Sequence, residues 1–296
     1  MSLFSLLGAL EIGLIFSLVA LGVLISFRLL RFPDLTVDGS FPLGGAVAAT
    51  LIAAGYDPFT STLVATAAGA CAGLVTGWLN VRLKIMDLLA SILMMIALYS
   101  INLRIMGKPN VPLITEPTVF TILQPSWLSD YEARPLLLLL VVLIAKFALD
   151  WFFATQTGLA MRATGSNGRM ARAQGVNTGG MILAGMALSN ALVALAGALF
   201  AQTQGGADIS MGIGTIVIGL AAVIVGESIL PSRKLVMATL AVILGAIVYR
   251  FFIALALNSD FIGLKAQDLN LVTAVLVTIA LVIPMLKRRL FGKKGR

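Results

Sequence analysis

The chain contains no histidine, one cysteine and few charged side chains. Without histidine it has no imidazole general base, no Ser-His-Asp triad and no imidazole ligand for a metal ion. Because Cys71 stands alone, the chain forms neither an internal disulfide nor a multi-cysteine metal site. Charged residues make up 11% of the sequence, whereas soluble domains carry about 25%. These absences argue against a soluble enzyme, and nothing in the pattern calls for a cofactor.

Apolar residues dominate what is present. Hydrophobic side chains occupy 59% of the 296 positions, and the mean hydropathy is +1.02. A helix needs about 20 apolar residues to cross a bilayer. The sequence therefore predicts an all-α polytopic membrane protein, a single transmembrane domain over residues 1–296. We expect about nine spanning segments, at residues 5–28, 41–56, 60–80, 87–106, 135–153, 179–202, 212–227, 235–256 and 268–286.

Lysine and arginine residues between these segments orient the chain, because cytoplasmic loops carry an excess of both. Placing the basic tail in the cytoplasm and counting back through nine segments predicts an external N-terminus. The side of the tail then receives 15 of the 21 basic residues, namely Arg28, Arg31, Arg82, Lys84, Arg162, Arg169, Arg172, Arg233, Lys234, Lys287, Arg288, Arg289, Lys293, Lys294 and Arg296. The net charge of +8 thus reflects membrane topology, and we expect no nucleic-acid partner.

Two parts of the sequence resemble each other. Residues 17–22 read SLVALG and residues 191–197 read ALVALAG, and each precedes an aspartate in a glycine-rich stretch, Asp38 or Asp208. The predicted topology gives the two parts opposite orientations, so we expect inverted repeats. Such repeats are typical of transporters, whose pathway lies where glycine or proline interrupts helices at the repeat interface. The expected units are repeat one (about 5–106), a connecting span (135–153), a cytoplasmic loop (154–178) and repeat two (about 179–286).

Polar side chains near these interruptions are candidates for a substrate pathway. A carboxylate inside a span costs about 2.5–3.5 kcal/mol on insertion scales unless it faces protein or water. Glu11 either serves the pathway or an interhelix hydrogen bond, or lies among outer headgroups if the first span begins later. Asp38 either lines the pathway or caps a helix N-terminus. The predicted pathway residues are Glu11, Asp38, Ser40, Asp208 and Ser210.

Two further spacings predict how helices pack. Lys146 and Asp150 are four residues apart and share a helix face. We interpret them as a neutralised pair with Lys146 snorkelling near the inner surface, and a substrate site is the alternative. Gly69, Gly73 and Gly77 repeat at every fourth position, which predicts close approach of another helix, within the subunit or between subunits.

The cytoplasmic loop 154–178 is expected to contain a short helix. Ser166 or Asn167 can cap its start, and Gly175 can end it in the left-handed conformation. Two helical turns are marginal alone. We therefore expect this helix to dock on a cytoplasmic partner. The external stretch 107–134 either docks an external partner or simply connects two spans.

The same loop resembles that of permease subunits in bacterial ABC importers of the branched-chain amino acid type, which are related to ribose-type permeases. Those loops carry Arg-Ala-x-Gly-x-Asn-x-x-x-Ala-x-x-x-Gly-[Ile/Val]-Asn. This chain matches at Arg162, Ala163, Gly165, Asn167, Ala171, Gly175, Val176 and Asn177. The stretches 188–197 and 219–227 also resemble the family, and the resemblance covers about residues 5–286. Residues 32–44 differ from it, because relatives often have an Asn-Phe-Ala-His-Gly-like stretch there.

The resemblance implies a multi-pass permease of the bacterial inner membrane that imports an amino acid or related small polar solute. Residues 33–40 look like those of permeases suspected to carry aromatic or related amino acids. The implied partners are a second permease subunit, preferably an identical one, a cytoplasmic ABC ATPase dimer, a periplasmic or lipid-anchored solute-binding protein, and membrane lipids. The residues expected to couple to the ATPase are Arg162, Gly165, Ser166, Asn167, Arg169, Ala171, Arg172, Gly175 and Asn177.

The chain has no Gly-x-x-x-x-Gly-Lys-[Ser/Thr] motif. It therefore cannot bind ATP through a P-loop, and a separate polypeptide must hydrolyse any ATP. We expect a transport subunit that is not itself an enzyme. The alternative from another class is a self-sufficient ion- or proton-coupled secondary transporter, which the inverted repeats and Glu11 would also suit. A membrane-embedded enzyme is a third possibility.

Overall fold

The computed structural model describes residues 3–124, 129–232 and 234–257, together with positions 275, 278 and 282. In this part of the chain, six helices are long and apolar enough to cross a membrane. They are α1 (Leu3–Val23) with its continuation η1 (Leu24–Leu29), α3 (Pro58–Val81), α4 (Asp87–Met106), α6 (Asp130–Ala154), α9 (Thr178–Thr203) and α11 (Leu235–Leu257). The expected helical, polytopic membrane fold is confirmed.

Two shorter apolar helices, α2 (Val37–Ala53) and α10 (Thr215–Ile229), coincide with the second and seventh predicted segments. The other long helices coincide with the remaining predicted segments up to the eighth. The ninth segment, 268–286, lies outside the described residues except at positions 275, 278 and 282. The count of nine spans therefore stays a prediction.

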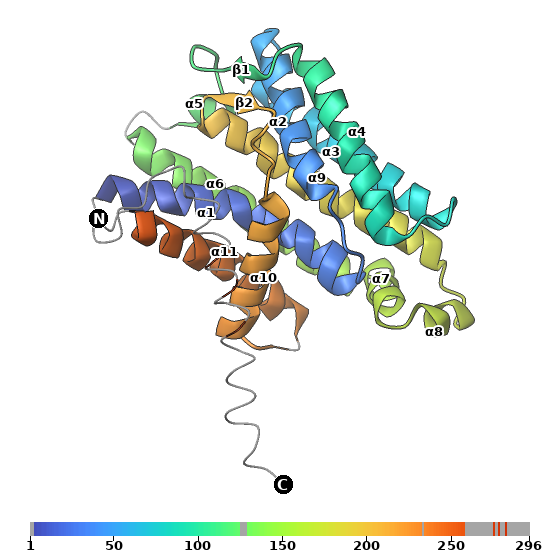
Figure 1. Ribbon diagram of the computed structural model, residues 1–296. Coiled ribbons are helices and arrows are strands. Elements are labelled where there is room, and N and C mark those ends of the chain that lie inside the picture. The colour runs from blue at the N-terminus through green and yellow to red at the C-terminus, as the bar shows by residue number, and fades with distance from the viewer. Residues whose placement is uncertain are drawn as a thin grey trace.

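The helices α1 and α9 lie at the centre of the molecule. Of their most apolar stretches, 78% and 61% are buried, against 28–44% for the other long helices. The helix α1 packs against α10 and α11, whereas α9 packs against α2 and α3. The two central helices also touch, because the Ser189 hydroxyl donates to the carbonyl of Gly22 at 2.8 Å. Figure 1 shows the long helices crossing the molecule in roughly the same direction.

Glycines let α3 and α9 approach closely. A Cβ added at Gly69 would collide with the carbonyl oxygen of Asn190, and one at Gly73 would collide with that of Met186. Gly77 continues the same line against Leu183. The close approach predicted from the glycine spacing is confirmed, and it lies within the subunit.

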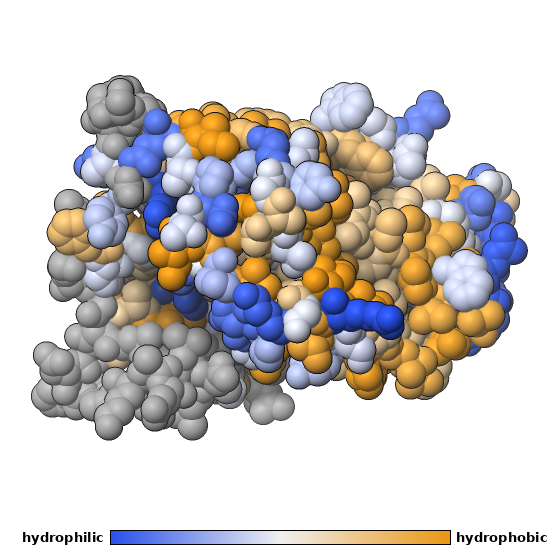
Figure 2. Space-filling view, turned by 90° about the horizontal axis from the view of Figure 1, so that it is seen from above, coloured by the Kyte–Doolittle hydropathy of each residue, from blue (hydrophilic) through white to orange (hydrophobic). Residues whose placement is uncertain are grey.

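Non-spanning elements gather at two ends of the molecule. At one end, β1 (Asn110–Pro112) pairs antiparallel with β2 (Gly206–Asp208), with α5 (Val119–Leu123) beside them. At the other end lie α7 (Gln156–Ser166) and α8 (Gly168–Ala173), as Figure 1 shows. Figure 2 shows an apolar surface over much of the right half of the view, with hydrophilic residues gathered along the right-hand edge. This distribution suits a molecule whose middle faces lipid.

The chain is interrupted between α1 and α2. The helix α1 ends in the wider π-helical turn η1, a feature that often occurs at functional sites. The backbone N–H of Phe32 then donates to the carbonyl of Ser26 at 2.8 Å, and Arg31 adopts φ of 56°. Residues 30–36 are not helical, so the chain turns inside the molecule and places Asp34 in a fully buried position.

Candidate functional site

The N-terminal ends of two short helices meet inside the molecule. With 17 and 15 residues, α2 and α10 are about 25 and 22 Å long, less than the roughly 30 Å of a bilayer core. Gly212, which precedes α10, lies against the carbonyl of Asp38 and the ring of Pro42 on α2. Interrupted helices whose N-terminal ends point into a membrane protein are typical of transporter substrate sites.

Asp38 joins the two helices. Its Oδ1 accepts a hydrogen bond from the backbone N–H of Ile216 at 2.7 Å, and its Oδ2 accepts one from Gly214 at 3.3 Å. Gly214 has φ of +82°, which turns the chain into the first turn of α10. The Asp38 side chain belongs to α2 but caps α10. Asp38 therefore caps a helix N-terminus, as one of the two interpretations predicted, but the helix that it caps is α10 and not α2.

The same carboxylate lines a cavity of about 520 Å³. The wall comes from α2, α4 and the segment between β2 and α10. Its residues are Asp38, Gly39, Pro42, Met95, Ile96, Tyr99, Ser100, Asn102, Ile209, Ser210 and Ile213. The cavity therefore brings together Asp38 and Ser210, two of the residues predicted for a pathway.

Asp208 lies next to this cavity, at the end of β2. Its Oδ1 accepts hydrogen bonds from the backbone N–H of Ser210 at 2.8 Å and from the Ser210 hydroxyl. Asn110, its partner on β1, donates to Oδ2 at 3.4 Å. The hydroxyl of Ser210 lowers the pKa of Asp208, so this carboxylate stays ionised at neutral pH. Asp208 orders the turn that carries Ser210 to the cavity.

Ser40 belongs to a different, fully buried network. Its hydroxyl donates to Asn190 Oδ1 at 2.7 Å. Asn190 Nδ2 donates to Asp34 Oδ2 at 2.8 Å, and Asp34 Oδ1 accepts from the backbone N–H of Thr36 at 2.9 Å. This network ties the interruption before α2 to the central helix α9. Ser40 is not among the residues that line the cavity, and its part in a pathway stays a prediction.

Glu11 is a half-buried residue of α1. Arg134 of α6 and the Thr203 hydroxyl of α9 are its polar neighbours. Arg134 also donates to the carbonyl of Thr203 at 3.5 Å. This arrangement fits the interhelix hydrogen-bonding interpretation of Glu11 and joins three helices. Glu11 is not among the residues that line the Asp38 cavity, and its part in a transport pathway stays a prediction.

The loop between α6 and α9 contains two helices. The predicted short helix is α8, whose start is capped by Asn167 through a 3.1 Å hydrogen bond from the N–H of Met170. Gly175 follows with φ of +83°, and the Val176 N–H closes the turn on the carbonyl of Ala171 at 3.0 Å. Asn177 caps α9 in the same way, accepting from the N–H of Gly180 at 3.1 Å.

The helix α7 was not expected from the sequence. Two of its residues are Gly158 and Gly165, and glycine lowers helix propensity. Both glycines lie in tight contacts, because a Cβ at Gly158 would collide with Phe153 and one at Gly165 would collide with the carbonyl of Leu29. Tertiary packing therefore stabilises α7 where local propensity does not. Gly165 places the loop directly against the end of η1.

The residues predicted to contact a cytoplasmic partner divide by exposure. The loop faces outward through Ser166, Asn167, Arg169, Arg172, Gly175 and Asn177, whereas Arg162 and Gly165 are half-buried. Ala171 is 4% exposed, so its side chain packs on the rest of this chain. Met170 is 63% exposed and was missed, although an apolar side chain between two arginines on a short helix is a signal for a docking face.

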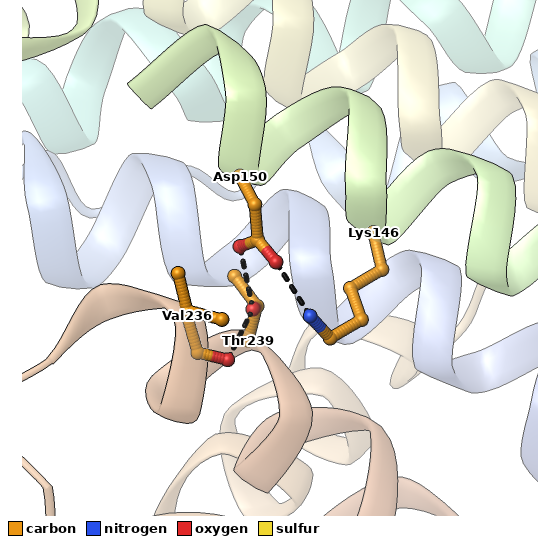
Figure 3. A network of polar contacts seen from close by, with 4 residues as sticks. All are labelled: Lys146, Asp150, Val236 and Thr239. Atoms are coloured by element: carbon orange, nitrogen blue, oxygen red, sulfur yellow. Dashed lines mark hydrogen bonds and ion pairs between the residues drawn. The ribbon is translucent and has the colours of Figure 1, made fainter. Parts of the chain in front are cut away.

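Lys146 and Asp150 form the expected ion pair, with 2.5 Å between Nζ and Oδ2. Figure 3 shows that Asp150 also reaches α11, because its Oδ1 accepts from the Thr239 hydroxyl at 2.8 Å. Lys146 is 5% exposed, so it is buried between helices and does not snorkel. This cluster connects α6 to α11.

Sequence reasoning missed Asn190, Tyr99 and Ser100. Asn190 is a fully buried amide within an apolar stretch of α9, and such a residue in a span marks an interhelix hydrogen bond. Tyr99 and Ser100 are exposed polar residues within the apolar helix α4. In the described part of the chain, no three Cys, Asp or Glu side chains cluster in a way that could hold a metal ion.

Known proteins resemble this chain over most of its length. A tyrosine transport system permease protein of Clostridioides difficile (strain R20291) is 40% identical over 266 residues, which cover 90% of this chain and 86% of that protein. The ribose import permease protein of Escherichia coli (strain K12) is 26% identical over 259 residues, 84% and 76% of the two chains. The galactofuranose transporter permease protein of that strain is 31% identical over 180 residues, 59% and 50%.

No solved structure matches the chain. The model of one protein family, described as branched-chain amino acid transport system / permease component, matches residues 5–286. The match covers both central helices, the Asp38 cavity and the loop that carries α8. The chain belongs to the family of branched-chain amino acid transport system permease components.

Proposed function

We propose that this chain forms the translocation pathway of an ATP-driven importer for an amino acid or a related small polar solute. The observation that carries the proposal is the cavity at Asp38, where the N-terminal ends of α2 and α10 meet. A relative named for tyrosine transport supports an amino acid as the solute, and relatives named for ribose and galactofuranose show that the family also includes permeases for sugars.

The pathway runs along the contact between two inverted repeats, residues 5–106 and 179–286. Packing supports the repeats, because the first helix of each half packs against the second and third helices of the other. Thus α1 contacts α10 and α11, and α9 contacts α2 and α3. A ninth span, predicted from the sequence at 268–286, would complete the second repeat.

The chain lies in a bacterial inner membrane with its N-terminus outside and its tail in the cytoplasm. Under this topology the β1–β2 end is external and receives a solute-binding protein, and α7 and α8 are cytoplasmic. The position of these elements at two ends of the molecule supports the orientation. A second copy of the chain completes the membrane part, and two ATPase subunits dock on the loops.

ATPase movement reaches the cavity through a short series of contacts. The exposed Arg169 and Met170 of α8 meet the ATPase, and Gly165 of α7 presses on the backbone of Leu29. The neighbouring Arg28 forms an ion pair with Glu227 of α10 at 2.9 Å. The opposite end of α10 is held by Asp38, so a shift of η1 would displace the helix that borders the cavity.

The experiment that tests this proposal is transport by purified components in liposomes. The permease is reconstituted with its candidate ATPase and solute-binding protein, to be sought among the genes next to its own, and tyrosine is the first labelled solute in an amino-acid panel. Uptake that requires ATP and all components supports the proposal. Accumulation by the permease alone under an ion or proton gradient would instead establish the secondary transporter.

A further inference from the structure

The cavity between α2 and α4 has an uneven distribution of charge. Among the described residues that line it, Asp38 is the one carboxylate, and none is lysine or arginine. Most of the remaining wall is apolar. A cavity of this composition favours a solute that carries positive charge on a largely apolar body.

The hydrogen bonds of Asp38 favour the ionised form of its carboxylate. The free N–H groups at the start of a helix carry partial positive charge and stabilise an anion. Asp38 occupies that position on α10, accepting one N–H bond on each oxygen. A carboxylate offers about four acceptor sites, so each oxygen still has a free lone pair.

The same arrangement disfavours an anionic group beside Asp38. Because Asp38 already occupies the start of α10, a solute carboxylate placed there finds this helix end neutralised and meets a like charge, so the carboxylate of an amino acid must lie away from Asp38. An entering ammonium group finds unused carboxylate lone pairs. The resident carboxylate therefore reverses the preference that a bare helix N-terminus would have.

We propose that the cavity binds the ammonium group of the solute at Asp38 and holds its apolar or aromatic part against Ile96, Tyr99 and Ile213. Tyr99 is 57% exposed and offers a ring for stacking or for a cation–π contact. This inference rests on the proposed function, since it assigns a solute class to the same pathway. It predicts that the cavity prefers a solute with an ammonium group to an uncharged solute such as a sugar.

The test measures which charged reagent reaches the cavity. Ser100→Cys is made in a Cys71→Ala background of the assembled complex, since Ser100 is exposed on the cavity wall. The probes are a trimethylammonium-ethyl and a sulfonato-ethyl methanethiosulfonate of similar size. The matched control is Ile122→Cys, a 50% exposed position on α5 at the β1–β2 end.

The quantity compared is the labelling rate of the cationic reagent divided by that of the anionic reagent. We expect this ratio to be about tenfold higher at Ser100→Cys than at Ile122→Cys, because one partly screened negative charge lies near Ser100. Adding Asp38→Asn should remove the excess preference, and Asp38→Glu should retain most of it. The comparison of the two cysteine positions with Asp38 intact needs no change at the cap, so it holds even if Asp38→Asn fails to assemble.

Equal ratios at the two positions, or a preference for the anionic reagent at Ser100→Cys, would overturn the proposal. Failure of both reagents to react at Ser100→Cys would also overturn it, because the cavity would then be closed to water. The result is independent of solute uptake. A complex with cation preference but no ATP-driven uptake would refute the proposed function and leave the charge selectivity of the cavity standing.

Discussion

Asp38 and Asp150 are both carboxylates within the helical bundle, yet their surroundings differ. Asp150 is neutralised by a buried lysine and bonded to a threonine on α11. Among the described residues, no cation is a hydrogen-bond partner of Asp38, which is held by two backbone N–H groups and faces a cavity. A paired carboxylate can only join helices, whereas one held by backbone dipoles keeps its charge available to a ligand.

The first prediction isolates the paired carboxylate. Lys146→Met should leave Asp150 buried without its cation and lower the free energy of unfolding by about 3–5 kcal/mol. The measurement is thermal unfolding of the purified complex. The double variant Lys146→Met/Asp150→Leu should recover most of the loss, because both buried charges are then gone. A single variant as stable as the unchanged chain would show that the pair is solvated.

A second prediction concerns Asp34, whose carboxylate is buried like that of Asp150 but contacts an amide. Asn190→Leu should remove the donor to Asp34 Oδ2 and cost about 1–3 kcal/mol. The control Ser40→Ala removes one hydroxyl from the far side of Asn190 and should cost about 1 kcal/mol. Equal losses in thermal unfolding of the two variants would mean that Asn190 does not support Asp34.

The third prediction concerns the end of α8, in the loop proposed to dock on the ATPase. Gly175→Val places a β-branched residue at φ of +83°, which costs about 1–2 kcal/mol. The end of α8 should distort, so that ATPase co-purification falls while the permease remains folded. The matched control is Gly168→Ala, where an added Cβ meets open space and φ is not positive. Normal ATPase binding by Gly175→Val would contradict a docking role for α8.

The smallest expected effect lies at Asp208. Because Ser210 depresses the pKa of Asp208, the native state gains stability above the usual carboxyl pKa and loses it as pH falls through the depressed value. Ser210→Ala should therefore lower the melting temperature slightly at neutral pH, with the difference shrinking toward acid pH. A difference that grows as pH falls would contradict the assignment.

Sequence periodicity located the helices well because each span must bury its backbone polar groups within itself. The sequence also located the two interruptions, since proline and glycine flank Asp38 and glycines flank Asp208. Ser40 was predicted for the pathway together with Asp38. Residues two apart on a helix point about 200° from each other, so Ser40 does not share the cavity face of Asp38, and its part in a pathway stays a prediction. Pro42, four residues from Asp38, shares its face and lines the cavity.

What the sequence could not supply is contact between distant segments. The cap that Asp38 provides to α10 joins residues 176 and 178 positions apart. Ala171 was expected at the docking face because of its size, and its burial depends on how α8 lies on the permease. The assignment of Asp208 as a counterpart of Asp38 came from repeat spacing, yet Asp208 bonds Ser210 and Asn110 outside the helices.

The central claim is that the Asp38 carboxylate acts on the solute and is not merely a cap, and ATP-driven uptake tests it most directly. Asp38→Asn keeps a side-chain oxygen for the cap and removes the charge. The account predicts an assembled complex whose initial uptake rate falls by about tenfold or more, the effect of losing one charge-assisted hydrogen bond, with Asp38→Glu retaining more activity. Unchanged uptake by an assembled Asp38→Asn complex would contradict the account.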